Sequence, residues 1–161
     1  MRKIMPGILA MTLIVVASNI LVQHILFNGW LTWGAFTYPL AFLTTDIMNR
    51  VYGPVVARKI ILVGFFTGII CSLVGTQIEN DYGPLVTLRI AIASGLGFIS
   101  AQFIDLAIFE KFRKTNWWKA PLISSVVGSF VDTTIFFSVA FSKKLSWIEP
   151  SNDVSWASDL R

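Results

Sequence analysis

The chain has 161 residues, of which 55% are hydrophobic and only 14% are charged, and its net charge is +4. A water-soluble domain has about 25% charged residues, so this composition could not cover the surface of one. The mean hydropathy of +0.69 indicates that the lipid bilayer is the solvent. The composition therefore predicts an all-α integral membrane protein, and it excludes a cytosolic enzyme, a coiled coil and a disordered tail.

Five apolar stretches are expected to cross the membrane, since a spanning helix needs about 20 mostly apolar residues. They predict a single transmembrane domain over residues 1–161, a polytopic helical bundle with a polar tail at 142–161 and helices at about 4–27, 30–48, 60–78, 84–109 and 121–141. Asn28 and Gly29 separate the first two helices, and Pro39 is expected to bend or interrupt the second. Pro84 and Pro121 are expected in first turns, where a missing N–H costs nothing.

The basic residues predict the orientation of this bundle. They gather before the first helix, between the second and third, and between the fourth and fifth: Arg2, Lys3, Arg50, Arg58, Lys59, Lys111, Arg113, Lys114 and Lys119. By the positive-inside rule the N-terminus is cytoplasmic and the tail is outside, with Lys143 and Lys144 as an exception. A signal peptide is the less favoured interpretation of the N-terminus, because its apolar run is too long and lacks a cleavage site.

Three acidic residues lie inside the predicted spans, namely Asp46, Asp105 and Asp132. An Asp at the centre of a membrane helix costs about 2.5–3.5 kcal/mol, so such residues face the bundle interior and usually mark a substrate or ion path. In the alternative interpretation, Asp46 and Asp105 reach the interface or pair with Arg50 or Arg113. Asp132 has no basic residue within two turns.

The sequences around Asp105 and Asp132 are alike. Residues 103–109 read Phe-Ile-Asp-Leu-Ala-Ile-Phe, and residues 130–136 read Phe-Val-Asp-Thr-Thr-Ile-Phe. Because consecutive spans run in opposite directions, the likeness hints at an inverted pair around a midplane site. Gln102 shares a helix face with Asp105, and Phe109 and Phe136 follow the two acids by four residues. Such a set suits a flat, uncharged heterocycle, and it suits a cation path as well.

Small residues at four-residue spacing predict close helix packing. They are Gly64, Gly68 and Ser72, then Ala93, Gly97 and Ala101, and finally Ser125 and Ser129.

Several short motifs between residues 10 and 141 occur in a fixed order. They include Ser18-Asn19-Ile20-Leu21-Val22-Gln23, Thr32-Trp33-Gly34, Thr44-Thr45-Asp46, Arg89-Ile90-Ala91, Gln102-Phe103-Ile104-Asp105, Trp117-Trp118-Lys119 and Asp132-Thr133. Together they resemble the queuosine precursor transporter family of the vitamin uptake transporter group. The resemblance implies a multi-pass importer of 7-deazaguanine queuosine precursors, chiefly 7-cyano-7-deazaguanine, in the bacterial inner membrane, where it serves salvage into tRNA.

The resemblance also implies candidate residues for substrate binding and transport. They match the family motifs and are Asn19, Gln23, Trp33, Asp46, Arg50, Arg89, Gln102, Asp105 and Asp132. In this interpretation a carboxylate of Asp105 or Asp132 accepts the N1–H and the exocyclic amine of the base. Gln102 meets the carbonyl of the base, and Trp33 or a phenylalanine stacks on its ring.

One departure from the family concerns the number of helices. The resemblance implies six helices with both ends in the cytoplasm, whereas the sequence predicts five helices and lacks the family's sixth. The expected site is then open on one side or completed by a second copy of the chain in a homo-oligomer. Two further interpretations stay open: a truncated, non-transporting membrane fragment, or the substrate-binding subunit of a multi-component vitamin importer. In the latter, ATP use would come from another chain, because no Walker A motif is present.

Other chemistries find little support in the sequence. There is no zinc motif, serine elbow or Cys/His pair, so an enzyme is disfavoured and neither a cofactor nor a metal is expected. Cys71 is the single cysteine, and His24 is interpreted as an interfacial residue. The excess of Lys and Arg is assigned to orientation rather than to nucleic acid. Residues 111–119 are interpreted as a topology determinant, with contact to anionic membrane lipid as the alternative.

Overall fold

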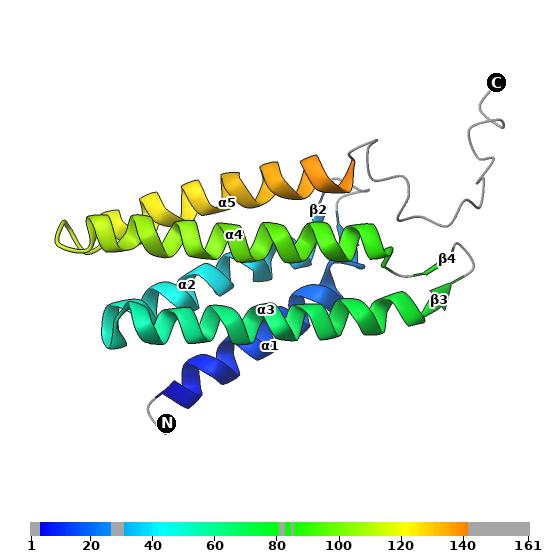
Figure 1. Cartoon of the computed structure of the whole chain (residues 1–161), viewed down its shortest axis with the longest axis horizontal. Helices are drawn as coiled ribbons and strands as arrows, with labels where there is room; N and C mark the ends of the chain where they lie inside the picture. The colour runs from blue at the N-terminus through cyan, green and yellow to red at the C-terminus, as the bar shows by residue number, and fades with distance from the viewer. Residues whose placement is uncertain (1–3, 27–30, 81–82, 85, 142–161) are drawn as a thin grey trace.

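The computed structural model describes residues 4–26, 31–80, 83–84 and 86–141 of the chain. Its five helices are α1 (Met5–Leu21), α2 (Gly34–Tyr52), α3 (Pro54–Gln77), α4 (Leu88–Phe112) and α5 (Lys119–Ala140). The predicted all-α class is therefore confirmed (Figure 1). The predicted break at Asn28 and Gly29 and the predicted polar tail at 142–161 lie outside the described residues.

Two short antiparallel hairpins, which the sequence did not predict, join helices at the same end of the bundle (Figure 1). Strands β1 (Ile25–Leu26) and β2 (Leu31–Thr32) pair between α1 and α2, and β3 (Glu79–Asn80) and β4 (Gly83–Pro84) pair between α3 and α4. We call this end the hairpin end.

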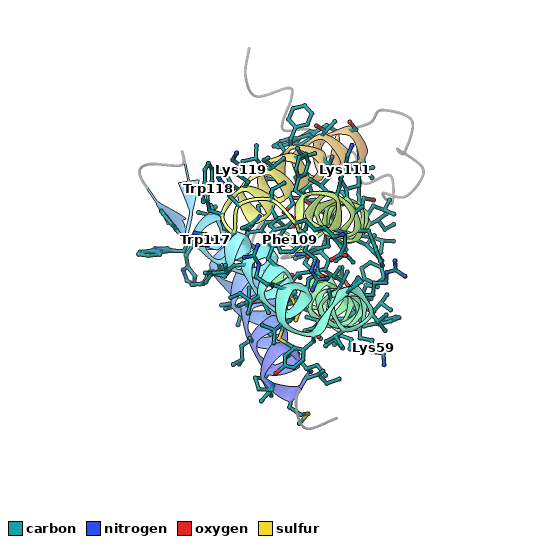
Figure 2. All side chains as sticks on the ribbon, turned by 90° about the vertical axis from the view of Figure 1, so that its left-hand side faces the viewer. Lys59, Phe109, Lys111, Trp117, Trp118 and Lys119 are labelled. Atoms are coloured by element: carbon teal, nitrogen blue, oxygen red, sulfur yellow. The ribbon has the colours of Figure 1, made fainter. Side chains whose placement is uncertain are left out.

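The opposite end carries basic side chains, and we call it the basic end. The connections between α2 and α3 and between α4 and α5 lie there (Figure 1). Figure 2 looks at this end and shows Lys59, Lys111 and Lys119 around its rim, with Trp117 and Trp118 beside them. The sequence placed basic residues in these two connections, and the fold brings both connections together.

The connection between α2 and α3 is tighter than predicted, because α3 begins at Pro54 rather than at residue 60. Gly53 has a φ of +86°, a left-handed conformation that glycine adopts without steric cost, and it reverses the chain in one residue. Pro54 then occupies the first position of α3, where its missing N–H is no loss. Pro39 does not interrupt α2, which continues through it to Tyr52.

The outer ends of α1 and α4 also differ from the expected bounds. α1 ends at Leu21 rather than at residue 27, before the first hairpin. α4 begins at Leu88 because Thr87 caps it, with its hydroxyl oxygen accepting a hydrogen bond from the Ile90 N–H at 3.3 Å. Pro84, expected in the first turn of this helix, instead lies in β4.

Three helices of the described part are long and apolar enough to cross a membrane, namely α3, α4 and α5. α1 is apolar but, with 17 residues, shorter than these three helices. α2, which contains Asp46 and Arg50, is less hydrophobic than they are. The five expected spans are thus all present as helices. These helices differ in length and hydropathy, and therefore in how well each alone could cross a lipid bilayer.

α2 lies in the middle of the bundle, where it contacts all four other helices. α4 and α5 pack together along their lengths, and α1 packs on α2 and α3. The core cluster between these helices is built from Met11, Val15, Ala41, Met48, Ile60 and Phe98. The small residues permit this approach: a Cβ atom added at Gly64 would lie 2.8 Å from Met11 Cγ.

Candidate functional site

One face of α2 carries the side chains that organise the interior. Its members recur every three or four residues and therefore share a face: Tyr38, Phe42, Thr45, Asp46 and Asn49. This face lies against α4 and α5. It carries one of the three intramembrane acids, Asp46, and it lies near the other two, Asp105 on α4 and Asp132 on α5.

Toward the hairpin end, Tyr38 and Asp132 form a hydrogen-bonded pair. The Tyr38 hydroxyl donates to Oδ1 of Asp132 at 2.9 Å. The Tyr38 ring also makes edge-on contacts, with 5.9 Å between its centre and that of Phe42 and 6.4 Å to that of Phe98. The pair thus joins α2 to α5, and the aromatic contacts join it to α4.

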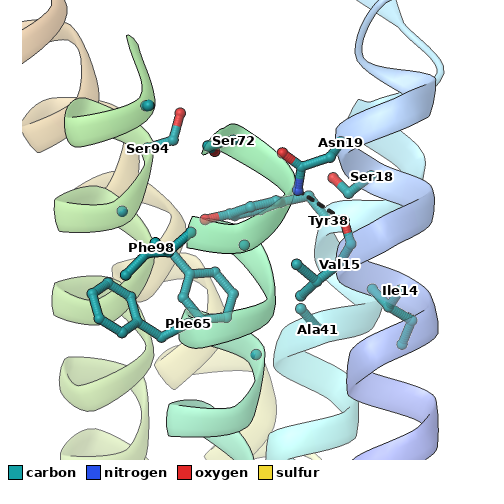
Figure 3. A pocket seen from close by; sticks show the side chains of 15 residues that line it. Ile14, Val15, Ser18, Asn19, Tyr38, Ala41, Phe65, Ser72, Ser94 and Phe98 are labelled. Atoms are coloured by element: carbon teal, nitrogen blue, oxygen red, sulfur yellow. Dashed lines mark hydrogen bonds between the residues drawn. The ribbon is translucent and has the colours of Figure 1, made fainter. Parts of the chain in front are cut away.

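Two adjoining cavities meet at this pair, and both are lined by Ser18, Asn19, Tyr38 and Ser94. The wider cavity has a volume of about 300 Å³ and also reaches Asp132 and Phe136, which are lining residues that sequence spacing placed on one face. The narrower one has a volume of about 80 Å³ and is bordered by Phe65 and Phe98. Figure 3 shows the Tyr38 ring reaching across the narrower cavity, with the two phenylalanines on one side and Asn19 on the other.

Asn19 is held in place within this region. Its amide Nδ2 donates a hydrogen bond to the Val15 carbonyl oxygen at 2.9 Å, the dashed line in Figure 3. Because this bond decides which way the amide points, it presents a fixed polar edge to the cavities.

Toward the basic end, a second polar region fills the seam between α2, α4 and α5. We call it the carboxylate cluster, and its members are Thr45, Asp46, Asn49, Gln102, Asp105, Ser124 and Ser125. Asp46 is 3% exposed and Asp105 is fully buried. The Thr45 hydroxyl donates to Oε1 of Gln102 at 2.8 Å, and the Ser125 hydroxyl lies 3.4 Å from Oδ2 of Asp46.

Several buried polar atoms of the carboxylate cluster have no well-formed hydrogen bond within the described part of the chain. They are Asp46 Oδ1, both side-chain atoms of Asn49, Gln102 Nε2 and both carboxyl oxygens of Asp105. The Asp46 carboxyl and the hydroxyls of Ser124 and Ser125 do lie near Asp105. Burying polar atoms without a partner is costly, so this cluster is a chemically unusual part of the interior.

The two acids of the matching sequences occupy reciprocal positions. A Cβ atom added at Gly97 of α4 would lie 2.7 Å from Asp132 Oδ1, and one added at Gly128 of α5 would lie 3.2 Å from Asp105 Cβ. Each aspartate thus packs on a glycine of the other helix. The two acids lie at different depths along the α4–α5 seam rather than sharing one midplane site, and the inverted relation stays a prediction.

The structure divides the nine residues expected from the sequence into three groups. Asn19 and Asp132 line the wider cavity, and Asp46, Gln102 and Asp105 belong to the carboxylate cluster. The other four lie outside both regions: Gln23, Trp33, Arg50 and Arg89.

Those four are placed as follows. Gln23 is exposed in the turn after α1, and Trp33 is 49% exposed at the start of α2, with its ring beside that of Phe36. Arg50 lies at the basic end with its guanidinium 5.5 Å from the centre of the Phe109 ring. Arg89 is half-buried at the start of α4, where its Nε donates to the Val139 carbonyl oxygen at 3.4 Å.

Sequence reasoning missed Tyr38, Ser94, Asn49 and Ser124. Asn49 follows Asp46 by three residues and so carried a detectable signal, since the two share a helix face. For Tyr38 no local signal existed, because its partner Asp132 is 94 residues away in the sequence.

Within the described residues neither Asp46 nor Asp105 forms an ion pair with Arg50 or Arg113, although Arg50 attracts Asp46 electrostatically. Arg113 forms an ion pair with Glu110 at 3.0 Å, and its Nη2 donates to the carbonyl oxygens of Asn49 and Arg50. It thereby caps the C-terminal end of α2, where carbonyl groups attract cations. Within the described ranges, no group of three or more His, Cys, Asp or Glu side chains could hold a metal ion.

Comparison with known proteins places these features in a family. The family described as "Putative vitamin uptake transporter" matches residues 32–156, which include the whole of α2, α4 and α5. The "Probable queuosine precursor transporter" of Haemophilus influenzae is 38% identical over 121 residues, covering 68% of this chain and 52% of that protein. No solved structure matches the chain.

Two further relatives are similar over most of the chain. The "Queuosine precursor transporter" of Escherichia coli is 34% identical over 142 residues, which is 80% of this chain and 64% of its own length. A "Probable queuosine precursor transporter" of Bacillus subtilis is 31% identical over 136 residues, which is 72% of this chain and 58% of that protein. This chain thus spans between 52% and 64% of the length of these relatives. The resemblance seen in the motifs is confirmed, and the chain belongs to the vitamin uptake transporter family.

Proposed function

We propose that the chain imports 7-deazaguanine queuosine precursors, with 7-cyano-7-deazaguanine as its substrate, across a bacterial inner membrane. The observation that carries the proposal is the pair of adjoining cavities, in which aromatic rings and hydrogen-bonding groups line the same space. The names of the three relatives support this substrate class. Because those relatives are longer, transport by this chain without further segments is part of the proposal.

The lining residues suit a flat, uncharged base. Such a base has apolar faces and an edge that both donates and accepts hydrogen bonds, and proteins bind it with rings and a few placed polar groups. Tyr38 and Phe98 would contact the faces, and Asp132 would accept the ring N–H and the exocyclic amine. Asn19 would meet the polar edge from the opposite wall. Asp132 is favoured over Asp105 for this role because Asp132 lines the wider cavity.

The proposal includes a direction. The basic end, where α1 begins, faces the cytoplasm by the positive-inside rule, so the hairpin end and its cavities face outward. In this state the substrate enters from outside and rests above the carboxylate cluster. The cytoplasmic orientation also places Arg50 at the side of release.

The test uses a bacterial host that can neither make nor import the precursor. The host expresses the chain, grows on a low concentration of 7-cyano-7-deazaguanine, and its tRNA is analysed for queuosine. We expect queuosine to return with the unaltered chain and to be lost with Asp132→Asn, because the amide cannot accept both donors of the base. Glu110→Gln is the matched control, since Glu110 is a carboxylate that lines neither cavity.

Membrane abundance of each variant is measured beside the queuosine content. The proposal is wrong if the unaltered chain is present in the membrane and queuosine stays absent. If Asp132→Asn restores as much queuosine as the unaltered chain at a limiting precursor concentration, Asp132 does not bind the substrate.

A further inference from the structure

The carboxylate cluster is not needed to hold the proposed substrate, yet it contains two buried acids side by side. Asp46 is 3% exposed, Asp105 is 0% exposed, and the two carboxyl groups are close enough to interact with each other. Two ionised carboxylates can only accept hydrogen bonds, which agrees with the unpartnered oxygens found on both. Two negative charges buried in one site of low dielectric constant also repel each other.

Charged groups on the neighbouring helices do not balance both acids. On α2, Arg50 attracts Asp46 electrostatically but is exposed, and neither acid forms an ion pair within the described ranges. On α4, Arg113 is already engaged with Glu110 and with backbone carbonyls. α5 contributes the hydroxyls of Ser124 and Ser125, and the α3 residues packed nearby, Ala57 and Ile61, are apolar. Arg50 can offset at most one negative charge, so the other requires a cation.

Two buried amides with unpartnered atoms lie one helical turn from the same acids. Asn49, which lies one turn from Asp46 on α2, and Gln102, which lies one turn from Asp105 on α4, are both fully buried and keep side-chain atoms without a partner. Most buried polar groups in proteins are hydrogen-bonded, so unpaired amide atoms beside two acids require a specific explanation.

From these contacts we propose that Asp46 and Asp105 together bind one exchangeable proton and that its passage drives substrate uptake. The inference rests on the proposed function and names its energy source. The pair binds one proton when it is exposed to the outside and becomes singly negative. It releases the same proton to the cytoplasm and returns to two charges, so one proton crosses the membrane in each cycle.

The packing favours a proton over a metal ion. Neither of the two adjoining cavities is lined by Asp46 or Asp105. Around the opposing Gly128, a Cβ atom would lie only 2.9 Å from Phe42 Cε1 and 3.2 Å from Asp105 Cβ. A hard metal ion such as Ca²⁺ needs about 6–8 oxygen ligands and space among them, whereas a proton needs no cavity.

α2 links this pair to the substrate cavities. Tyr38 contacts Asp132 at one end of the polar face, and its ring contacts Phe42, which lies beside Asp105 across Gly128. Asp46 follows Phe42 by four residues on the same face. A shift of α2 on substrate binding would therefore change the separation of Asp46 from Asp105, and with it the affinity of the pair for the proton.

The experiment separates proton-driven accumulation from exchange. The purified chain is placed in lipid vesicles and supplied with labelled 7-cyano-7-deazaguanine, either under an imposed pH gradient that is acidic outside or as counterflow against unlabelled substrate. Exchange needs no net proton movement. We expect Asp46→Asn and Asp105→Asn to lose gradient-driven accumulation, down to the level of empty vesicles, and to keep counterflow. Glu110→Gln should keep both activities.

A second measurement requires neither substrate nor transport. The infrared spectrum of the unaltered chain at neutral pH should contain the C=O band of a protonated carboxylic acid, which both single variants lose and Glu110→Gln retains. Absence of this band would overturn the inference, as would accumulation by either variant at the unaltered level. Accumulation that follows a sodium gradient and ignores the pH gradient would overturn it as well. If the unaltered chain fails in counterflow, the proposed function itself is wrong.

Discussion

At the scale of single residues, the Tyr38–Asp132 bond is the contact that joins a membrane-buried acid to the central helix. Its length of 2.9 Å and its place on the cavity wall give Asp132 a fixed orientation toward any bound molecule. Because the donor is neutral, the bond places no positive charge beside Asp132. An arginine at this position would instead compete for both carboxyl oxygens.

Replacing Tyr38 by phenylalanine tests this bond while keeping the ring contacts. We expect Tyr38→Phe to lower the free energy of unfolding by about 1 kcal/mol, a typical value for one hydrogen bond, because water in the cavity can solvate Asp132 in its place. Denaturant unfolding in detergent measures the change. Tyr52→Phe, the same substitution on the 42% exposed tyrosine at the end of α2, is the control. Equal effects of the two substitutions would contradict the proposed role of the bond.

At the scale of elements, the seam between α4 and α5 depends on glycines that face the two acids. Gly97 and Gly128 allow Asp132 and Asp105 to approach the opposing backbone. Without a strong hydrophobic drive between helices in lipid, such close contact is a main source of helix association. The glycines therefore position the functional side chains as well as packing the helices.

Alanine at these glycines should destabilise the bundle. A Cβ atom at Gly128 would meet Phe42 at 2.9 Å and the Ala101 carbonyl oxygen at 3.3 Å, and one at Gly97 would meet Asp132 Oδ1 at 2.7 Å. Overpacking of this kind costs about 1–3 kcal/mol, so we expect a decrease of that size in the free energy of unfolding. The larger effect is expected for Gly128→Ala, because the buried Phe42 ring and the Cβ of Asp105 have less freedom to move away than the carboxyl oxygen of Asp132.

Gly68→Ala provides the control for both substitutions. The atom nearest to a Cβ there is Val15 Cγ1 at 3.6 Å, an ordinary contact, so the helix should gain about 0.5–1 kcal/mol from replacing a glycine in its interior. Thermal unfolding of the three variants in one detergent measures the difference. Destabilisation by Gly68→Ala as large as that by Gly128→Ala would show that packing at the seam is not the cause.

At the scale of the whole molecule, charge and shape divide the bundle into two ends with different chemistry. The hairpin end holds the cavities, and the basic end holds the lysines visible in Figure 2. The carboxylate cluster lies between the cavities and the basic end, so a molecule that crosses the bundle from the cavities would pass it. This order underlies both the proposed direction of transport and the proposed proton path.

Cysteine labelling tests the orientation directly. In a Cys71→Ser background, Gln77→Cys reports on the hairpin end and Lys114→Cys on the basic end, and both positions are exposed. We expect a membrane-impermeant maleimide to label Gln77→Cys in intact spheroplasts, and Lys114→Cys only after the membrane is opened, because positive loops stay in the cytoplasm. The reverse pattern would invert the proposed topology.

The class of the protein and the existence of its helices could be predicted from the sequence. A composition with so few charges excludes a soluble surface, and a long apolar run is helical in lipid whatever its neighbours are, since its backbone groups must bond within the segment. The interior placement of Asp105 could also be predicted, because exposing a carboxyl side chain to lipid is costly. Helix ends were less accurate, because they depend on single residues such as Gly53 and Thr87.

Which residues meet across helices was decided only by the tertiary structure. Helical spacing relates Gln102 to Asp105 within one element, but it contains no information on the relative depth and rotation of two helices. The register of α2 on the α4–α5 seam pairs Tyr38 with Asp132 and brings Asp46 to Asp105, and it leaves Trp33 on the outside. The amino-acid sequence alone therefore determined the membrane class and the buried acids. The packing of the helices decided which acid lines a cavity and which acids face each other, because those contacts join residues far apart in the chain.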